Sequence, residues 1–221
     1  MTSMSLQTTR EVVEASEHLP AGTTLVVPEV NWDDYERLLE TFAECHLRVN
    51  YDCGRLEIVS PLPEHERYGR FIEDLVLLYC QAFDIAIEKF GSATWKKRAL
   101  AKGAEPDCCY YVRNARRIIG KRELSLESDP PPDIVVEIDT TSNSLRKFGI
   151  YAALAVPEIW RYDGRIAKIY HLRKKEYAEI PASRFLRGMT GALLAEFIEL
   201  SKTQGQTEAR RAFQRRIRTL R

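Results

Sequence analysis

The 221-residue sequence predicts an α/β fold in which a central mixed β-sheet is flanked by α-helices. Three observations favour this fold class. Two runs of alternating apolar and polar residues lie within 48–59, a long helical pattern follows over 63–90, and an apolar strand that carries carboxylates lies at 133–139. Strands and helices thus follow one another along the chain, as in a sheet that helices cover. The length suits one domain of moderate size with terminal extensions.

Capping and turn residues predict the N-terminal elements. Residues 1–20 contain several acids and few large apolar groups, so we expect a loosely ordered extension. Asn31 is followed three residues later by the acid Asp34, and apolar residues recur behind it at helical spacing, which predicts a short helix. The turn sequence Asp52-Cys53-Gly54 separates the two alternating runs of 48–59 and predicts a β-hairpin.

The middle of the chain should contain one long helix and two strands. The buried stripe of an amphipathic helix over 63–90 consists of Tyr68, Phe71, Ile72, Leu75, Leu78, Tyr79 and Phe83. Residues 94–100 and 107–112 are predicted as strands, and Gly103 is expected to loosen the link between them. Three prolines at 130–132 then fix an extended entry into the strand 133–139.

The strand at 133–139 has acids on one face. Side chains alternate along a strand, so Ile134, Val136 and Ile138 can pack inward while the other face carries Asp133, Val135, Glu137 and Asp139. Three acids on one face repel one another, and a divalent cation relieves the repulsion because hard cations such as Mg²⁺ bind carboxylate oxygens. The alternative is a half-exposed edge strand whose acids are solvated. The strand pattern alone favours neither reading.

The C-terminal third should consist of a helix, a hairpin and two further helices. Residues 140–144 offer several N-caps for a helix that Pro157 ends, and Asp163-Gly164 is a favoured hairpin turn. Helices are expected over 191–202 and 206–219. We therefore divide the chain into an N-terminal extension (1–20), a main domain (21–203) and a basic C-terminal helix (204–221).

Composition excludes several classes of protein. No apolar run approaches the roughly 20 residues that span a bilayer, and residues 1–10 lack the apolar core of a signal peptide. We therefore expect a cytoplasmic protein without a membrane partner. The five cysteines include no Cys-x-x-Cys pair, which argues against a disulfide framework and a zinc cage.

The net charge of +1 conceals a division between the two parts of the chain. Residues 1–92 hold 7 Lys/Arg and 17 Asp/Glu, whereas residues 93–221 hold 26 and 15. Basic clusters in the second part predict a phosphate backbone as partner, with DNA expected and a homodimer left open. For any single cluster, the alternative is a solvated face that pairs with the acidic part. The candidate nucleic-acid-binding residues are Lys96, Lys97, Arg98, Arg116, Arg117, Arg210, Arg211 and Arg215.

The order and spacing of several short motifs across residues 48–172 resemble a known family. The motifs are Gly54-Arg55-Leu56-Glu57-Ile58-Val59-Ser60-Pro61 with His65 after it, Glu105-Pro106-Asp107, Pro132-Asp133-Ile134-Val135-Val136-Glu137-Ile138, Lys147 four before Tyr151, and Val156-Pro157-Glu158-Ile159-Trp160. Together they resemble the Uma-two family of restriction endonuclease-like proteins, within the PD-(D/E)xK nuclease superfamily. The resemblance implies a restriction-endonuclease-like fold.

The same resemblance implies a function and roles for individual residues. It implies that Asp107 and Glu137 are metal-binding acids, that the carbonyl of Ile138 is a further ligand, and that Mg²⁺ or Mn²⁺ is the metal. The implied reaction is metal-dependent hydrolysis of phosphodiester bonds, with DNA as the expected substrate. Lys147 is implied to position and help deprotonate the attacking water, or to place a positive charge beside the transition state.

One residue departs from the superfamily pattern, because Asp139 stands two after Glu137, where the lysine usually lies. Lys147, at the start of the next helix, can reach the same space, and the adjacent Arg146 could substitute for it. The departure favours a second hypothesis, a catalytically silent module of the same fold that binds nucleic acid or protein. A third is an unrelated metal-dependent hydrolase of small molecules.

Four further acids are candidate auxiliary groups. Glu66 or Glu73, on the long helix, could complete the metal shell, although solvated surface acids are the alternative for both. Asp133 could be an outer ligand or cap its strand. Asp139, on the acidic face, is the fourth.

Overall fold

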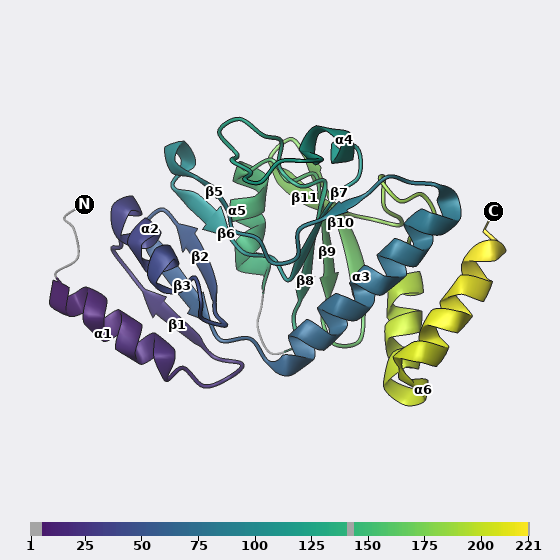
Figure 1. The fold of residues 1–221 in the computed structure, drawn as a ribbon, viewed down its shortest axis with the longest axis horizontal. Helices are drawn as coiled ribbons and strands as arrows, with labels where there is room; N and C mark the ends of the chain where they lie inside the picture. The colour runs from purple at the N-terminus through teal and green to yellow at the C-terminus, as the bar shows by residue number, and fades with distance from the viewer. Residues whose placement is uncertain (1–5, 141–143, 221) are drawn as a thin grey trace.

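The computed structural model describes residues 6–140 and 144–220, and within them two β-sheets lie side by side with helices against both (Figure 1). Sheet A has the strand order β1-β3-β2-β6-β5, and sheet B has the order β11-β10-β9-β8-β7-β4. The mixed sheet of the prediction is sheet B, in which β8 and β9 are parallel and the other pairs are antiparallel. Sheet A as a separate layer was not predicted.

Sheet A consists of short antiparallel strands. Its members are β1 (Thr24–Val27), β2 (Arg48–Asp52), β3 (Arg55–Val59), β5 (Trp95–Lys97) and β6 (Lys102–Ala104). The β2–β3 hairpin is confirmed, and its turn residues Cys53 and Gly54 both have positive φ values, of 48° and 98°. This is the conformation that a two-residue hairpin turn requires.

Gly103 lies in β6, so the expectation of a loose link at this position was wrong. β6 pairs with β2 on one side and with β5 on the other. A Cβ atom at Gly103 would lie 2.2 Å from the hydroxyl oxygen of Tyr35, so only glycine lets β6 pass beneath this ring. The glycine therefore permits close packing rather than flexibility.

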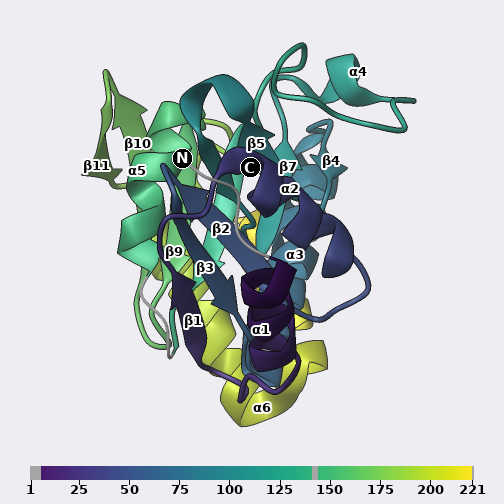
Figure 2. The same cartoon turned by 90° about the vertical axis from the view of Figure 1, so that its left-hand side faces the viewer.

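Two helices cover the outer face of sheet A (Figure 2). They are α1 (Leu6–Glu17) and α2 (Trp32–Thr41), and the side chain of Asn31 caps α2 by accepting the N–H of Asp34 at 2.9 Å. The capped helix is confirmed. The helix α1 differs from the loose extension expected for residues 1–20, because Val12 and Ser16 are buried.

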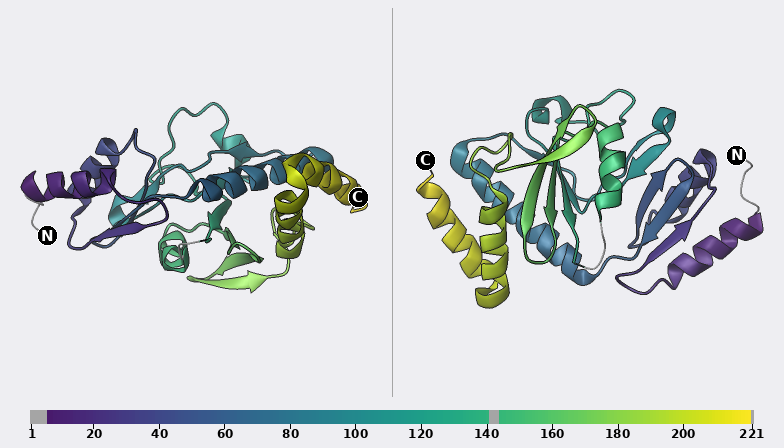
Figure 3. Two further views of the ribbon diagram at one scale, coloured as in Figure 1. Left: turned by 90° about the horizontal axis from the view of Figure 1, so that it is seen from below. Right: turned by 180° about the vertical axis from the view of Figure 1, so that it is seen from behind.

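Sheet B carries the acidic strand and has helices on both faces (Figure 3). One face packs on α3 (Pro63–Phe83) and the kinked α6 (Gly191–Arg218), and the other packs on α5 (Lys147–Ala153). Its strands are β4 (Glu88–Lys89), β7 (Cys108–Tyr111), β8 (Ile134–Ile138), β9 (Glu158–Tyr162), β10 (Ala167–Arg173) and β11 (Glu176–Ile180). Shorter helical elements are η1 (Arg98–Leu100), α4 (Ala115–Ile118) and η2 (Ser144–Arg146).

Strand β8 is an interior strand, because β7 and β9 pair with its two edges. The half-exposed edge strand considered above is therefore wrong. Asp133, Glu137 and Asp139 are 0%, 2% and 6% exposed, so their charges are buried rather than solvated. Buried carboxylates need hydrogen bonds or counter-charges, and the partners of each one define its role.

Three element boundaries differ from the prediction, the first being the strand expected over 94–100, which ends at Lys97, after which η1 begins. The long helix α3 ends at Phe83 rather than near 90, because Asp84 adopts a left-handed conformation with φ of 54°. The helix α5 begins at Lys147, and its N-cap residue is Arg146, whose side chain makes no capping hydrogen bond. Of the N-caps expected at 140–144, residues 141–143 lie outside the described residues. The β9–β10 hairpin is confirmed, with Asp163 donating its N–H to the carbonyl of Ile166 at 3.1 Å across the turn.

The C-terminal residues form two helical segments, as predicted, because Gly205 has non-helical φ and ψ values of 82° and 157° inside α6. Both segments join the same core as α3, with Phe197 and Phe213 in edge-to-face contact at 5.1 Å. Residues 204–218 thus pack on the main core. In the described residues, no helix is both long enough and apolar enough to span a bilayer.

Candidate active site

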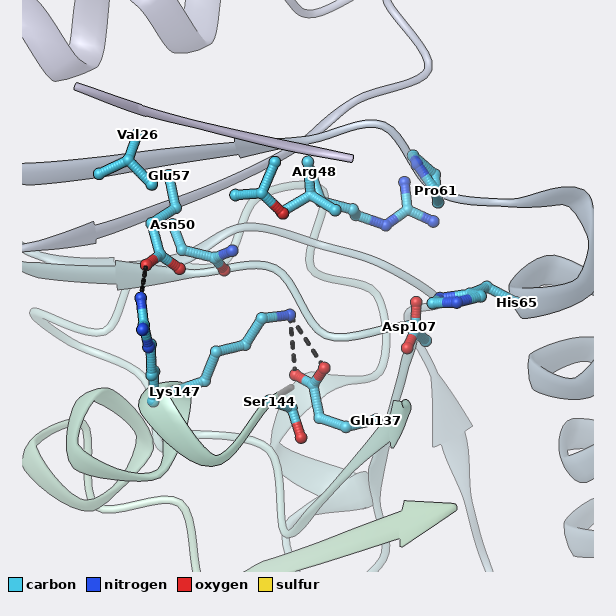
Figure 4. Close-up of a pocket in the computed structure, with 13 residues that line it drawn as sticks. Val26, Arg48, Asn50, Glu57, Pro61, His65, Asp107, Glu137, Ser144 and Lys147 are labelled. Carbon is cyan, nitrogen blue, oxygen red and sulfur yellow. Dashed lines mark hydrogen bonds and ion pairs between the residues drawn. The ribbon is translucent and has the colours of Figure 1, made fainter. Parts of the chain in front are cut away.

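Asp107 and Glu137 lie on neighbouring segments of sheet B and line one pocket, of about 320 Å³, between the two sheets (Figure 4). The N–H of Asp107 donates to the carbonyl of Val136 at 3.1 Å. Asp107 Oδ2 in turn accepts the N–H of Ile138 at 2.7 Å. The first bond continues the backbone pairing of β7 with β8 to Asp107, and the second holds the Asp107 carboxylate beside the end of β8 where Glu137 lies.

Two residues of α5, one helical turn apart, are partners of Glu137. Lys147 Nζ lies 2.9 Å from Oε2 and 3.1 Å from Oε1 of Glu137, and the hydroxyl of Tyr151 donates to Oε1 (Figure 4). Lys147 Nζ also donates to the carbonyl of Glu105 at 3.1 Å. Because residues four apart share one helix face, Lys147 and Tyr151 reach the same carboxylate.

Burial sets the protonation of this cluster. Burial raises the pKa of Glu137 to about 7, with Lys147 opposing the shift and the negative charge of Asp107 adding to it. For Lys147, burial lowers the pKa, but the charges of Glu137 and Asp107 outweigh burial and hold its pKa above the ordinary value. Lys147 therefore stays protonated at neutral pH, and Glu137 ionises near neutrality when no metal is bound.

This set of donors fits a hard divalent cation. In the part of the chain that the structure describes, no cluster of three or more His, Cys, Asp or Glu side chains could hold a metal. A closed zinc or calcium cage is thus absent from these residues. The carboxylates of Asp107 and Glu137 both line the pocket, and Mg²⁺ commonly binds through one or two carboxylates and keeps several waters. A cation between Asp107 and Glu137 would also relieve their repulsion.

Asp133 lies at the opposite end of β8 from Glu137. It is fully buried, and its Oδ2 accepts the N–H groups of Val112 and Asn114 at 2.9 and 3.0 Å. Of the two roles considered, these bonds correspond to the structural one, since they fix the turn between β7 and α4. Asp133 does not line the pocket.

Asp139 holds the segment that leads to Lys147. Its carboxylate accepts the N–H and the hydroxyl of Ser144 at 3.0 Å, and Arg161 Nε donates to it. The carboxylate of Asp139, at the usual lysine position, thus contacts Arg161 and the start of η2, and it does not line the pocket that contains Asp107 and Glu137. This explains how an acid can stand there while Lys147 supplies the positive charge next to Glu137.

The two helix acids also lie outside the pocket lining. Glu66 pairs with Arg48 and lies 3.9 Å from Arg70. Glu73 lies 3.3 Å from Arg70 and 4.0 Å from Lys89. The structure therefore gives both acids basic partners instead of bringing them to Asp107 and Glu137.

The eight candidate nucleic-acid-binding residues do not line this pocket either. Several pair with acids of the N-terminal part, as the alternative reading anticipated. Lys96 and Arg98 contact Glu36 at 2.9 and 2.6 Å, and Arg210 contacts Asp74 at 3.0 Å. Lys97 donates to the carbonyl of Leu126 at 3.3 Å, Arg116 and Arg117 lie in α4, and Arg211 and Arg215 lie in α6.

The basic residues that do line the pocket come from other elements: Arg48 from β2, His65 from α3, and Arg146 and Lys147 beside each other at α5. Sequence reasoning missed Arg48 and also Asn50, which share one face of β2. Figure 4 shows His65 next to Asp107 and Arg48 above it on the wall formed by sheet A. The available signal was the alternation in β2, where polar residues occupy every second position.

Comparison with known proteins places the chain in a family. A solved structure described as a "putative nuclease belonging to DUF820", from Anabaena variabilis ATCC 29413, has 14% sequence identity and a TM-score of 0.44, and the match covers 67% of this chain and 89% of that chain. No curated protein gives a match. The model of the Uma2 family, described as "Putative restriction endonuclease", matches residues 32–201. Because the match includes most of the chain, the protein belongs to the Uma2 family.

Proposed function

We propose that this protein is a metal-dependent endonuclease that hydrolyses phosphodiester bonds in DNA, with its active site in the pocket between sheets A and B. The observation that carries the proposal is the convergence of Asp107, Glu137 and Lys147 in one pocket, with Lys147 Nζ 2.9 Å from Glu137. Membership in a family of restriction endonuclease-like proteins supports the same reaction class.

Asp107 and Glu137 would hold Mg²⁺ or Mn²⁺, with the carbonyl of Ile138 as a further ligand. Such a cation supplies Lewis acidity toward the phosphate and lowers the pKa of an attacking water. Tyr151 keeps Glu137 in place by donating its hydroxyl hydrogen to Oε1. Burial and the charge of Glu137 raise the pKa of Tyr151, so the phenol remains a donor.

Lys147 acts as a fixed positive charge beside the scissile phosphate. Because the neighbouring carboxylates hold its pKa above the ordinary value, it stabilises developing negative charge and orients the water rather than acting as a neutral base. Its replacement by alanine should lower kcat more than it weakens DNA binding. A loss confined to affinity would contradict this role.

The test is incubation of the purified protein with supercoiled plasmid in Mg²⁺, Mn²⁺ or EDTA, with Asp107→Ala and Glu137→Ala variants purified in parallel. We expect nicked or linear products from the wild type with metal, and none in EDTA or from either variant. Equal cleavage in EDTA, or by the variants, would overturn the proposal. Labelled RNA and a small phosphodiester, used as alternative substrates, separate DNA hydrolysis from the other substrate classes.

A catalytically silent binding module makes a different forecast, namely DNA binding without cleavage in any metal. The feature that favoured it was Asp139 at the usual lysine position. The contact of Lys147 with Glu137 weakens that argument, because a lysine reaches the carboxylate from α5 instead.

A further inference from the structure

We propose that β2 forms an anion-binding wall of the active-site pocket, in which Arg48 and Asn50 donate hydrogen bonds to the phosphate backbone of the DNA being cleaved. The inference rests on the proposed function for its substrate class. The choice of Arg48 and Asn50 rests on their positions in sheet A.

The alternation of β2 divides its side chains between the two faces of sheet A. Val49 and Tyr51 belong to the apolar cluster beneath α1 and α2, whereas Arg48 and Asn50 line the pocket on the opposite face. The pocket thus has two walls. Asp107, Glu137 and Lys147 form one, and β2 with its neighbours in sheet A forms the other (Figure 4).

Asn50 has a buried donor that no protein group satisfies. The side chain is 1% exposed, and its Oδ1 accepts the N–H of Glu105 at 3.2 Å. An N–H group can only donate, so this bond fixes which end of the amide faces Glu105. Nδ2 is left buried without a hydrogen-bond partner. A buried unpaired donor costs free energy unless a ligand or water accepts its hydrogen bond.

Arg48 has a second unsatisfied donor on the same wall. Its side chain is 11% exposed and pairs with Glu66 through Nη2, while Nε is buried without a partner. A guanidinium group presents several donors in a fixed plane and matches the oxygens of a phosphate. Two independent buried donors without partners thus belong to residues two apart on one strand face, and both residues line the pocket that holds the proposed metal ligands.

One acid also lines this wall. Glu57 lies opposite Asn50 in the β2–β3 ladder, and a carboxylate there would repel a phosphate. Its charge is compensated, because Arg55 contacts it at 2.8 Å and Arg146 at 3.6 Å. The wall as a whole thus offers donors and positive charge to an anion.

The experiment is fluorescence anisotropy of a short fluorescein-labelled DNA duplex in EDTA, so that metal binding and cleavage do not contribute. Arg48→Met removes the guanidinium group. Asn50→Asp keeps the oxygen that accepts the Glu105 N–H and replaces the unpaired donor by an acceptor. Lys168→Met is the matched control, because it removes one positive charge from β10, where Lys168 pairs with Glu179 at 2.9 Å.

We expect each β2 variant to raise Kd about tenfold or more, and the control to change it by less than about twofold. Arg48→Met should also lower the slope of log K against log salt by about 0.9, as the loss of one phosphate contact requires. Melting temperatures of all variants establish that they are folded, and if one variant fails to fold, the other decides.

Folded variants that bind DNA as tightly as the wild type would overturn the proposal, as would a wild type that binds no DNA. An equal loss in Lys168→Met would overturn it too, because the effect would then reflect net charge alone. The proposed function fails separately. If the wild type binds DNA through Arg48 and Asn50 but never cleaves it, the anion-binding role of β2 is supported and the proposed nuclease function is not. If the wild type cleaves DNA and both variants bind DNA as tightly as the wild type, the nuclease function is supported and the role of β2 is not.

Discussion

Replacement of Tyr151 by phenylalanine tests whether Glu137 is a buried carboxylate that ionises near neutral pH. The variant keeps the buried ring and removes only the hydroxyl that donates to Glu137. A hydrogen bond to a charged acceptor contributes about 1.5–3 kcal/mol, which corresponds to a further rise of roughly one to two units in the pKa of Glu137.

The sign of the pH dependence follows from the raised pKa. Burial raises the pKa of Glu137 from the ordinary 4.5 to about 7, so the folded state binds an extra proton between these values. In the metal-free wild type, Glu137 should therefore lower the free energy of unfolding by about 3 kcal/mol as pH rises from about 4.5 to about 7. In Tyr151→Phe the loss continues above pH 7, because the folded-state pKa is higher still.

Urea denaturation in EDTA near pH 5 and near pH 9 measures this difference. Relative to wild type, Tyr151→Phe should cost less than about 1 kcal/mol near pH 5 and about 1.5–3 kcal/mol near pH 9. The matched control is Tyr111→Phe, since Tyr111 is equally buried but donates to the neutral carbonyl of Pro130 at 2.8 Å. In Tyr111→Phe, the free energy of unfolding should fall by the same amount at both pH values. An equal loss for Tyr151→Phe at the two pH values would refute the assignment.

Three shorter predictions concern other parts of the molecule. Asp133→Asn should lower the free energy of unfolding by about 1–3 kcal/mol, because it weakens the bonds that the buried carboxylate accepts from the N–H groups of Val112 and Asn114, and should leave Mn²⁺ affinity unchanged in a titration. Gly103→Ala should destabilise the protein by about 1–3 kcal/mol in urea denaturation, and pairing it with Tyr35→Phe should recover part of the loss. Combined glutamine substitution of Arg210, Arg211 and Arg215 should weaken DNA binding in anisotropy less than Arg48→Met does, since these residues lie outside the pocket.

The elements that sequence reasoning predicted well are those with local signals. The cap at Asn31, the turn at Cys53-Gly54 and the apolar stripe of α3 each depend on residues close in sequence. Sheet A was missed as a separate layer because β6 has three residues and pairs with β2 some 50 positions away along the chain. No local pattern encodes such a pairing, and a glycine in a short strand is easily mistaken for a link.

The site residues likewise include some that the sequence predicted and some that it did not. The resemblance placed Asp107, Glu137 and Lys147 in one cluster, and the structure brings them to one pocket. The roles of the other acids depend on partners that are distant in sequence, such as Asn114 for Asp133 and Arg161 for Asp139. The wall formed by β2 was missed because an arginine and an asparagine in a strand usually face solvent.

Metal-dependent stabilisation shows whether Asp107 and Glu137 hold a divalent cation, on which the proposed nuclease activity depends. Calorimetric melting of wild type and Asp107→Asn should be compared in EDTA and in millimolar Mn²⁺. At a concentration about 100 times Kd, a ligand that binds only the folded state adds roughly 2.7 kcal/mol, or about 5–10 °C for a chain of this size. If both carboxylates hold the cation, the melting temperature of the wild type should rise by this amount, and that of Asp107→Asn should not rise. An unchanged melting temperature of the wild type, or an equal rise in both proteins, would contradict metal binding by these two residues.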